Sequence, residues 1–268
     1  MYFCKSKKYK MKEILRVEEL CKTFKLSPKQ QKIERTTQRY KTAVDHLSFN
    51  AYQGEIFGLL GPNGAGKTTT LRMLSTLIRP DSGDAIIDGS SVVNHPTDVR
   101  SKIAFLTSEL KLEDFFTPNY IFDFFSKLHG VDERLMQERK QQMFSRFGID
   151  KFAEVKVANL STGMKQKLSL IVSLVHQPNI IIFDEPTNGL DVLTARTVTD
   201  YLQELRSEGK TIILSTHIFS LVERLCDRVG IIIDGRMISC GTLNEVCGDM
   251  NLEDRFFEIY KEQKGGEE

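Results

Sequence analysis

Nine consecutive residues combine glycines, a lysine and threonines at a spacing that suits the binding of a polyphosphate. They satisfy the pattern GxxxxGK[ST] and are Gly61, Pro62, Asn63, Gly64, Ala65, Gly66, Lys67, Thr68 and Thr69. Glycines carry no side chain, so backbone N–H groups of the loop reach the phosphate oxygens, and a following helix adds its positive N-terminal end. We expect Lys67 to reach the β- and γ-phosphates and the Thr68 hydroxyl to ligate Mg2+.

The sequence on either side of this glycine loop supports that interpretation. Residues 55–60 form a short apolar run that predicts a strand, and Leu71, Leu74 and Ile78 recur at helical spacing after the loop. Strand, glycine loop and helix are the context that the phosphate-binding pattern requires. A glycine turn before a helix is the structural alternative, but it does not account for a lysine followed by three threonines.

A glycine loop alone fits kinases, GTPases and many ATPases, so a second chemical element is needed to choose among them. The apolar run 180–183 ends in two acids, Asp184 and Glu185. Asp184 is suited to hold Mg2+ through water, and Glu185 to polarise the water that attacks a γ-phosphate. His217 directly follows another predicted strand, 211–216, and nucleotides bind at the carboxyl ends of parallel strands.

The order of the predicted elements indicates an α/β fold. From residue 160 onward strands and helices alternate, and wholly apolar strands imply a parallel sheet covered on both faces. Residues 14–24 and 43–52 predict antiparallel strands, and the polar stretch 27–39 between them predicts a loop insertion at a sheet edge.

Residues 105–129 are rich in aromatic side chains, seven in 25 residues against 24 in the 268 of the chain. One face of a predicted helix carries the apolar residues Ile121, Phe124, Phe125 and Leu128. Its simplest role is the core of a small helical subdomain. Phe115 and Phe116 fall outside this stripe, so a second interpretation stays open, a surface that accepts a partner helix.

Composition argues against several functional classes. Lys and Arg number 37 against 36 Asp and Glu, a net charge of +1, so no strong overall field favours nucleic acid. The apolar runs are much shorter than the roughly 20 residues that cross a bilayer. The first residues contain no apolar segment of a secretion signal. Five cysteines without a CxxC pair are typical of reduced thiols in the cytosol.

Residues 1–13 form a lysine-rich N-terminal segment, which predicts a solvated basic tail. Contact with anionic lipid is an alternative, since each basic residue near such a surface gains about 1 kcal/mol. Translation from Met11 is another alternative, because the globular pattern begins directly after it.

A further segment carries a resemblance to a known family. Residues 160–167, LSTGMKQK, are similar to the LSGGQ signature that marks the ABC ATPase family among P-loop ATPases. The segment precedes Asp184 and Glu185 as the signature does in that family. Residues 188–191, NGLD, resemble the D-loop of the family, and His217 resembles its switch histidine. The likeness covers roughly residues 14–245, with five motifs in the right order.

The resemblance implies a division of the chain into subdomains. Residues 14–105 and 160–245 would form the P-loop NTPase core of RecA type, with a parallel sheet and an antiparallel β subdomain. Residues 106–159 would form an inserted α-helical subdomain, and residues 246–268 a C-terminal tail with a frayed end.

The resemblance also implies a head-to-tail dimer that encloses ATP between the glycine loop of one subunit and the signature of the other. Ser161 and the N–H groups near Gly163 would offer the γ-phosphate a second positive helix end, and Asp191 would cross the interface. Glu185 would act as base or position the water, while Lys67 and His217 would stabilise the γ-phosphate. A monomer would then bind ATP but hydrolyse it poorly.

One aromatic residue after the first strand would stack on adenine. Phe24 is the better match to the family pattern and Tyr40 is the rival, because the insertion of residues 27–39 blurs the alignment. The sequence departs from the family at Ser108, which takes the place of the Q-loop glutamine and is too short to reach Mg2+ as glutamine does. Thr162 and Met164 replace Gly and Gln of the signature.

The segments LSTGMKQK and TSEL resemble ATPases of sodium-extruding and ABC-2-like exporters. The implied protein is the ATPase subunit of an exporter of sodium or another small solute, placed on the cytoplasmic face of the membrane and docked on separate membrane-spanning permease subunits. Two alternatives stay open: a soluble ABC ATPase that acts on ribosomes or nucleic acid, and a nucleotide sensor without turnover, which Ser108 keeps open.

Overall fold

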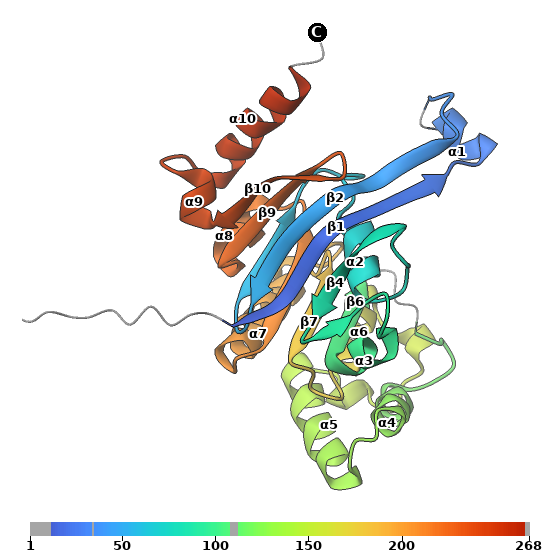
Figure 1. Ribbon diagram of the computed structural model, residues 1–268. Helices are drawn as coiled ribbons and strands as arrows, with labels where there is room; N and C mark the ends of the chain where they lie inside the picture. Colours follow the sequence, from blue (N-terminus) through green and yellow to red (C-terminus); the bar gives the residue numbers. More distant parts are fainter. Residues whose placement is uncertain (1–11, 34, 108–111, 266–268) are drawn as a thin grey trace, which may run out of the picture.

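The computed structural model describes residues 12–33, 35–107 and 112–265, and the strands in this part of the chain form two sheets (Figure 1). The larger sheet has the order β10-β9-β3-β8-β7-β6. Its strands are β3 (Ile56–Leu60), β6 (Ile103–Thr107), β7 (Ile180–Asp184), β8 (Thr211–Thr216), β9 (Arg228–Ile233) and β10 (Arg236–Thr242). Neighbouring strands are parallel except β10, which pairs antiparallel with β9. Every residue of β3, β7 and β8 is buried, as expected for apolar strands covered on both faces.

Alternate residues of the parallel strands enter two different cores. Ile181 and Phe183 of β7 lie in one core with residues of α6, α7 and α8. Ile180 and Ile182 lie in the other core with residues of α2 and of the smaller sheet. The helices are α2 (Lys67–Leu74), α6 (Thr162–Ser173), α7 (Val192–Ser207) and α8 (Phe219–Leu225). The alternation follows from the two-residue period of a strand. The parallel pairing of β3 and β7 with β8 brings the carboxyl ends of these strands to one edge.

The smaller sheet is antiparallel and has the order β2-β1-β4-β5. Its strands are β1 (Glu13–Lys25), β2 (Tyr40–Tyr52), β4 (Ser82–Ile87) and β5 (Ser90–Ser91). The long β1–β2 ribbon projects to one side in Figure 1 and carries a short helix, α1 (Pro28–Ile33), near its tip. The insertion predicted as a loop therefore contains a helix of six residues. Helix α3 (Pro96–Lys102) leads from β5 to β6.

The helical subdomain lies at the lower end of Figure 1 and consists of α4 (Pro118–Leu128), α5 (Glu133–Phe147) and the 3-10 turns η1 (Asp150–Phe152) and η2 (Val157–Asn159). Thr117 and Asp132 cap the two helices, and Gly148 ends α5 with a φ of 67°. The rings of Phe122 and Phe144 meet edge to face at 5.6 Å. The α/β fold with a parallel sheet, an antiparallel β subdomain and an inserted helical subdomain is thus confirmed, whereas its residue boundaries stay predictions.

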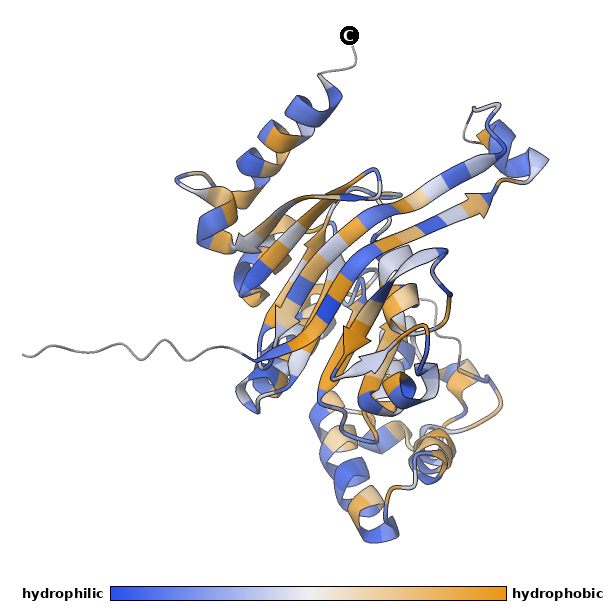
Figure 2. Ribbon diagram, viewed as in Figure 1, coloured by the Kyte–Doolittle hydropathy of each residue, from blue (hydrophilic) through white to orange (hydrophobic). Residues whose placement is uncertain are grey.

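The C-terminal segment differs from the predicted tail. It contains α9 (Leu243–Cys247) and α10 (Leu252–Lys264), and Figure 2 shows apolar and polar bands alternating along α10. Leu252, Phe256 and Ile259 are buried in the core that also holds α8, because they recur at helical spacing on one face. The tail prediction is therefore corrected for residues 252–264.

Three sequence predictions lie outside the described residues: the basic tail up to residue 11, the start at Met11, and Ser108 in place of the glutamine. Among the helices that the structure describes, none is both long enough and apolar enough to span a membrane.

Candidate nucleotide-binding site

The glycine loop connects β3 to α2, as the sequence predicts, and the protein's own packing requires two of its glycines. Gly66 has a φ of 102°, and a Cβ there would lie 2.2 Å from the carbonyl oxygen of Ala43. A Cβ on Gly61 would lie 2.3 Å from the carbonyl oxygen of Ile232. Both distances are shorter than any van der Waals contact, so a side chain at either position would displace the loop from the neighbouring backbone.

Lys67, the first residue of α2, is buried and folds back over the loop. Its Nζ donates to the carbonyl oxygens of Gly61 at 2.7 Å and Pro62 at 3.1 Å, and it lies 3.7 Å from Oε1 of Glu185. Burial lowers the pKa of Lys67 below its usual value, although the carboxylates of Glu185 and Asp184 oppose the shift. The ammonium group is thus held between the loop and the acids at the end of β7.

Asp184 and Thr68 lie together, as the proposed Mg2+ site requires. The Thr68 hydroxyl donates to Oδ1 of Asp184 at 3.0 Å, and the Ser215 hydroxyl donates to the same oxygen at 2.5 Å. Hydroxyl and carboxylate oxygens are the donors that Mg2+ prefers, so these side chains fit that ion. Ser215 was not predicted from the sequence. The signal was present in the strand register, since Asp184 of β7 pairs with Ser215 of β8.

Glu185 points to a different partner from its neighbour Asp184. Its Oε1 lies 3.1 Å from Nδ1 of His217, and its backbone N–H donates to Ser215. The backbone of Glu185 is left-handed, with a φ of 54°, so the chain turns sharply where β7 ends. This turn separates the two acids: Asp184 faces Thr68, and Glu185 faces His217 and Lys67.

A cavity of about 470 Å³ lies beside Lys67, Thr68, Glu185 and His217. It is lined by Phe24, Lys41, Ala43, Asn63, Gly64, Gly66, Lys67, Thr68, Thr69, Glu185, Asn188 and His217. Phe24 is 38% exposed at this cavity, whereas Tyr40, 60% exposed, does not line it. Lys41 and Asn188 were not singled out from the sequence for this cavity. Lys41 is the cross-strand partner of Phe24, which brings it to the same rim.

Ser161, Gly163 and Asp191 lie together but do not line this cavity. The Ser161 hydroxyl caps α6 by accepting from the N–H of Met164 at 3.3 Å, and a Cβ on Gly163 would lie 3.6 Å from Oδ2 of Asp191. Asp191 caps α7, and its hydrogen bonds to Thr194 and Leu193 hold its pKa below the usual range. Ser161 and Gly163 at the start of α6 and Asp191 at the start of α7 therefore form a second group, separate from the cavity.

The fold and the cavity define a P-loop nucleoside triphosphatase. A family model described as ABC transporter matches residues 44–188. The ABC transporter ATP-binding protein NatA of Bacillus subtilis is 37% identical over 213 residues, which cover 79% of this chain and 87% of that protein. An uncharacterized ABC transporter ATP-binding protein of Methanocaldococcus jannaschii is 39% identical over 221 residues, which cover 82% and 80%.

Solved structures agree with this family assignment. The structure of an ATP-binding subunit of an ABC transporter matches with a TM-score of 0.81 and 26% identity. The match covers 92% of this chain and 100% of that subunit. A dimeric ATP-binding cassette in a post-hydrolysis state with ADP and Pi has a TM-score of 0.75 at 23% identity, with 85% and 98% covered, which shows the shared fold. The chain belongs to the ABC transporter family and is an ATP-hydrolysing ATP-binding cassette. The family predicted from the signature and its companion motifs is confirmed.

Proposed function

We propose that this chain is the ATPase subunit of an exporter and powers transport through separate membrane-spanning subunits by ATP-driven closure of a dimer. The observation that supports it most directly is the division of the site: residues of the loop, Glu185 and His217 line one cavity, while Ser161 and Gly163 lie outside it. A second copy would bring its own signature residues to the cavity. Two relatives, one named for linearmycin resistance and one for Nod factor export, also support an exporter.

The chemistry within one cavity follows from the positions of the side chains. Glu185 accepts the proton of the water that attacks the γ-phosphorus, while the bond from that phosphorus to the ADP oxygen breaks. His217 holds the Glu185 carboxylate from 3.1 Å, and both His217 and Lys67 face the phosphate position. Thr68 and Asp184 would hold Mg2+, which neutralises charge on the phosphate oxygens when it is bound. Phe24 stacks on the adenine ring.

Closure of the dimer completes the site. Ser161 is the N-cap of α6, a helix of 12 residues, so the first N–H groups of α6, including that of Gly163, form a positive helix end. Pressed against the γ-phosphate of the other subunit's ATP, these groups stabilise the closed state. Hydrolysis removes that phosphate and releases the interface. Asp191 lies beside Gly163 and reaches the same interface.

The surface proposed for the membrane subunit is the aromatic face of α4 and the loop before it. Among the large apolar side chains of α4, only Ile121 and Phe122 are buried. Phe124 is 51% exposed and Leu128 67%, so the predicted stripe does not lie wholly in the core. A groove of about 400 Å³ lies there. It is lined by Leu112, Glu113, Phe116, Tyr120, Ile121, Phe124 and Phe125. An apolar helix end of a permease subunit fits such a groove.

The test of the catalytic assignment is Glu185→Gln, which keeps the shape of the side chain and removes the base. Turnover should fall at least about a hundredfold, the usual contribution of a general base, while ATP binding persists and a dimer accumulates in ATP. Steady-state phosphate release and size-exclusion chromatography measure the two effects. Glu208→Gln, at the far end of α7, is the matched control and should hydrolyse normally. Hydrolysis by Glu185→Gln at the wild-type rate would assign the base to another residue.

The test of the exporter assignment is purification of the tagged chain from detergent-solubilised membranes. We expect an integral membrane protein to co-purify. Ribosomes or nucleic acid in its place would support the alternative, a soluble ABC ATPase. Sodium or another small solute is the cargo that we propose, from the likeness of residues 160–167 to sodium-extruding exporters, and transport assays in vesicles with the co-purified partner would identify it.

A further inference from the structure

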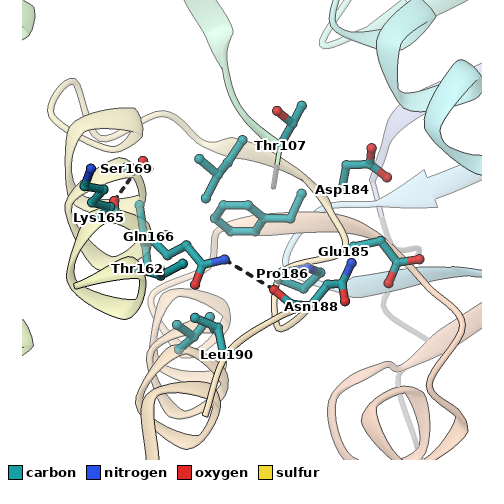
Figure 3. A pocket seen from close by; sticks show the side chains of 14 residues that line it. Thr107, Thr162, Lys165, Gln166, Ser169, Asp184, Glu185, Pro186, Asn188 and Leu190 are labelled. Carbon is teal, nitrogen blue, oxygen red and sulfur yellow. Dashed lines mark hydrogen bonds between the residues drawn. The ribbon is translucent and has the colours of Figure 1, made fainter. Parts of the chain in front are cut away.

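Gln166 connects the helix that begins at Ser161 with the turn that follows Glu185. Its Nε2 donates to the carbonyl oxygen of Asn188 at 3.3 Å, a bond drawn in Figure 3. Ser161 and Gln166 belong to the same helical segment: Ser161 is the N-cap of α6, and Gln166 lies little more than one turn further along. A displacement of the α6 N-terminus therefore moves Gln166 with it, because one turn of helix is rigid.

The turn that Gln166 contacts is hydrogen-bonded to the backbone of Glu185. The N–H of Asn188 donates to the carbonyl oxygen of Glu185 at 3.1 Å, so Asn188 and Glu185 are joined by a hydrogen bond within the turn. Glu185 has the left-handed φ of 54°, which a residue with a Cβ adopts only when its surroundings hold it there. Asn188 lines the nucleotide cavity together with Glu185, so a shift of Asn188 would change the cavity beside Glu185, where the γ-phosphate would lie.

The space between α6 and this turn is a second cavity, of about 180 Å³, shown in Figure 3. Gln166, Glu185 and Asn188 all line it, and the Gln166 side chain extends across it to Asn188. Oε1 of Gln166 is buried and has no hydrogen-bond partner within residues 12–33, 35–107 and 112–265. An unpaired buried carbonyl is unfavourable, so the hydrogen bond from Nε2 to the Asn188 carbonyl oxygen must hold the amide in this orientation.

We infer that Gln166 is a positioning residue. It adjusts the position of Glu185 for hydrolysis when the signature of its own chain contacts the ATP bound by the partner subunit. The inference rests on the proposed function, because it needs ATP of the second subunit to press on Ser161 and Gly163. The path runs from the α6 N-terminus through Gln166 to the Asn188 carbonyl, and through the turn to Glu185. It makes each active site sensitive to ATP in the other one.

Gln166→Met tests this path, since methionine keeps the length and the helix propensity of glutamine but donates no hydrogen bond. The kcat for ATP should fall about three- to tenfold, the effect of one neutral hydrogen bond, with KM for ATP within about twofold of wild type. Gln166→Glu, which replaces the donor with a carboxylate of the same shape, should lower kcat at least as much. In a Glu185→Gln background, the ATP-dependent dimer should still form with Gln166→Met.

Gln203→Met is the matched control, because Nε2 of Gln203 also donates to a backbone carbonyl, that of Arg224 at 3.4 Å, far from the nucleotide cavity. Its kcat should equal that of wild type. An unchanged kcat in both Gln166 variants would overturn the inference, and so would loss of the ATP-dependent dimer together with a lowered Tm, because Gln166 would then only stabilise α6. The proposed function is judged separately, from hydrolysis by the wild-type chain and its loss in Glu185→Gln.

Discussion

The buried ammonium group of Lys67 predicts a particular pH dependence of ATP binding. Burial lowers its pKa in the free protein, and phosphate oxygens beside it would raise that pKa in the complex. Below the lowered pKa the group is protonated in both states, so affinity does not vary with pH on its account. Above that pKa, binding must take up a proton, and affinity should fall as pH rises, by at most about tenfold per pH unit.

The measurement is the Kd of a non-hydrolysable ATP analogue between about pH 8 and pH 10.5, above the titration of the terminal phosphate and up to the ordinary range of lysine. Lys41 lines the same cavity, so Lys41→Gln is the control: the alkaline decline should persist in it. A decline that disappears in Lys41→Gln would assign the proton uptake to Lys41 and contradict the prediction.

At the scale of single residues, sequence spacing identified the groups that the fold brings to one cavity, and it missed those that depend on neighbouring elements. Asp184 and Glu185 end one strand and His217 follows the next, so parallel pairing alone places them at one edge. Ser215 and Gln166 escaped notice because their contacts depend on a cross-strand register and on the approach of a helix to a turn. Neither is visible as a spacing along the chain.

At the scale of elements, α10 is a helix that was not predicted from the sequence although a signal existed. Leu252, Phe256 and Ile259 recur at helical spacing, and Asn251 caps the helix by accepting from the N–H of Asp254. The sequence prediction gave residues 246–268 only as a C-terminal tail, with fraying at its last residues. The boundary of α2 shows a limit of another kind: spacing up to Ile78 suggested a longer helix, but Thr76 adopts a φ of 62° and the helix ends at Leu74.

The burial of α10 predicts that it contributes to stability. Phe256 is 6% exposed and packs against the rings of Phe219 and Tyr260 at 5.2 and 6.0 Å. Phe256→Ala should lower the free energy of unfolding by about 2–4 kcal/mol, through lost burial and the cavity left behind. Phe257, one residue further and 48% exposed, is the control, and Phe257→Ala should cost less than about 1 kcal/mol. Urea denaturation measures both, and equal effects would show that α10 is not anchored by its buried face.

At the scale of the whole molecule, the order of apolar runs, glycine turns and motifs was sufficient to predict the two sheets and the inserted helices. The reason is that wholly apolar strands must be buried on both faces, and a parallel sheet that is covered on both faces buries all of these strands at once. The proposal that two subunits share one active site has a different origin. It is supported by the observation that Ser161 and Gly163 do not line the cavity formed by Lys67 and Glu185 of the same chain.

This division predicts that two inactive variants restore each other's activity. Lys67→Ala disables the loop and Ser161→Glu places a negative charge where the γ-phosphate of the partner's ATP would bind, so each homodimer should have two defective sites. In a mixed dimer one site collects both defects, while the other combines an intact loop with an intact signature. Random pairing makes half of the dimers mixed, and each mixed dimer has one intact site of two, so an equal mixture should recover at most about one quarter of wild-type turnover. Mixing Lys67→Ala with Glu185→Gln is the control, because both changes affect the half of the site that contains the loop. Each of the two sites in that mixed dimer then contains one of the changes. Activity should stay at the level of the separate variants. Recovery in the control, or none in the first mixture, would contradict a site shared between two copies.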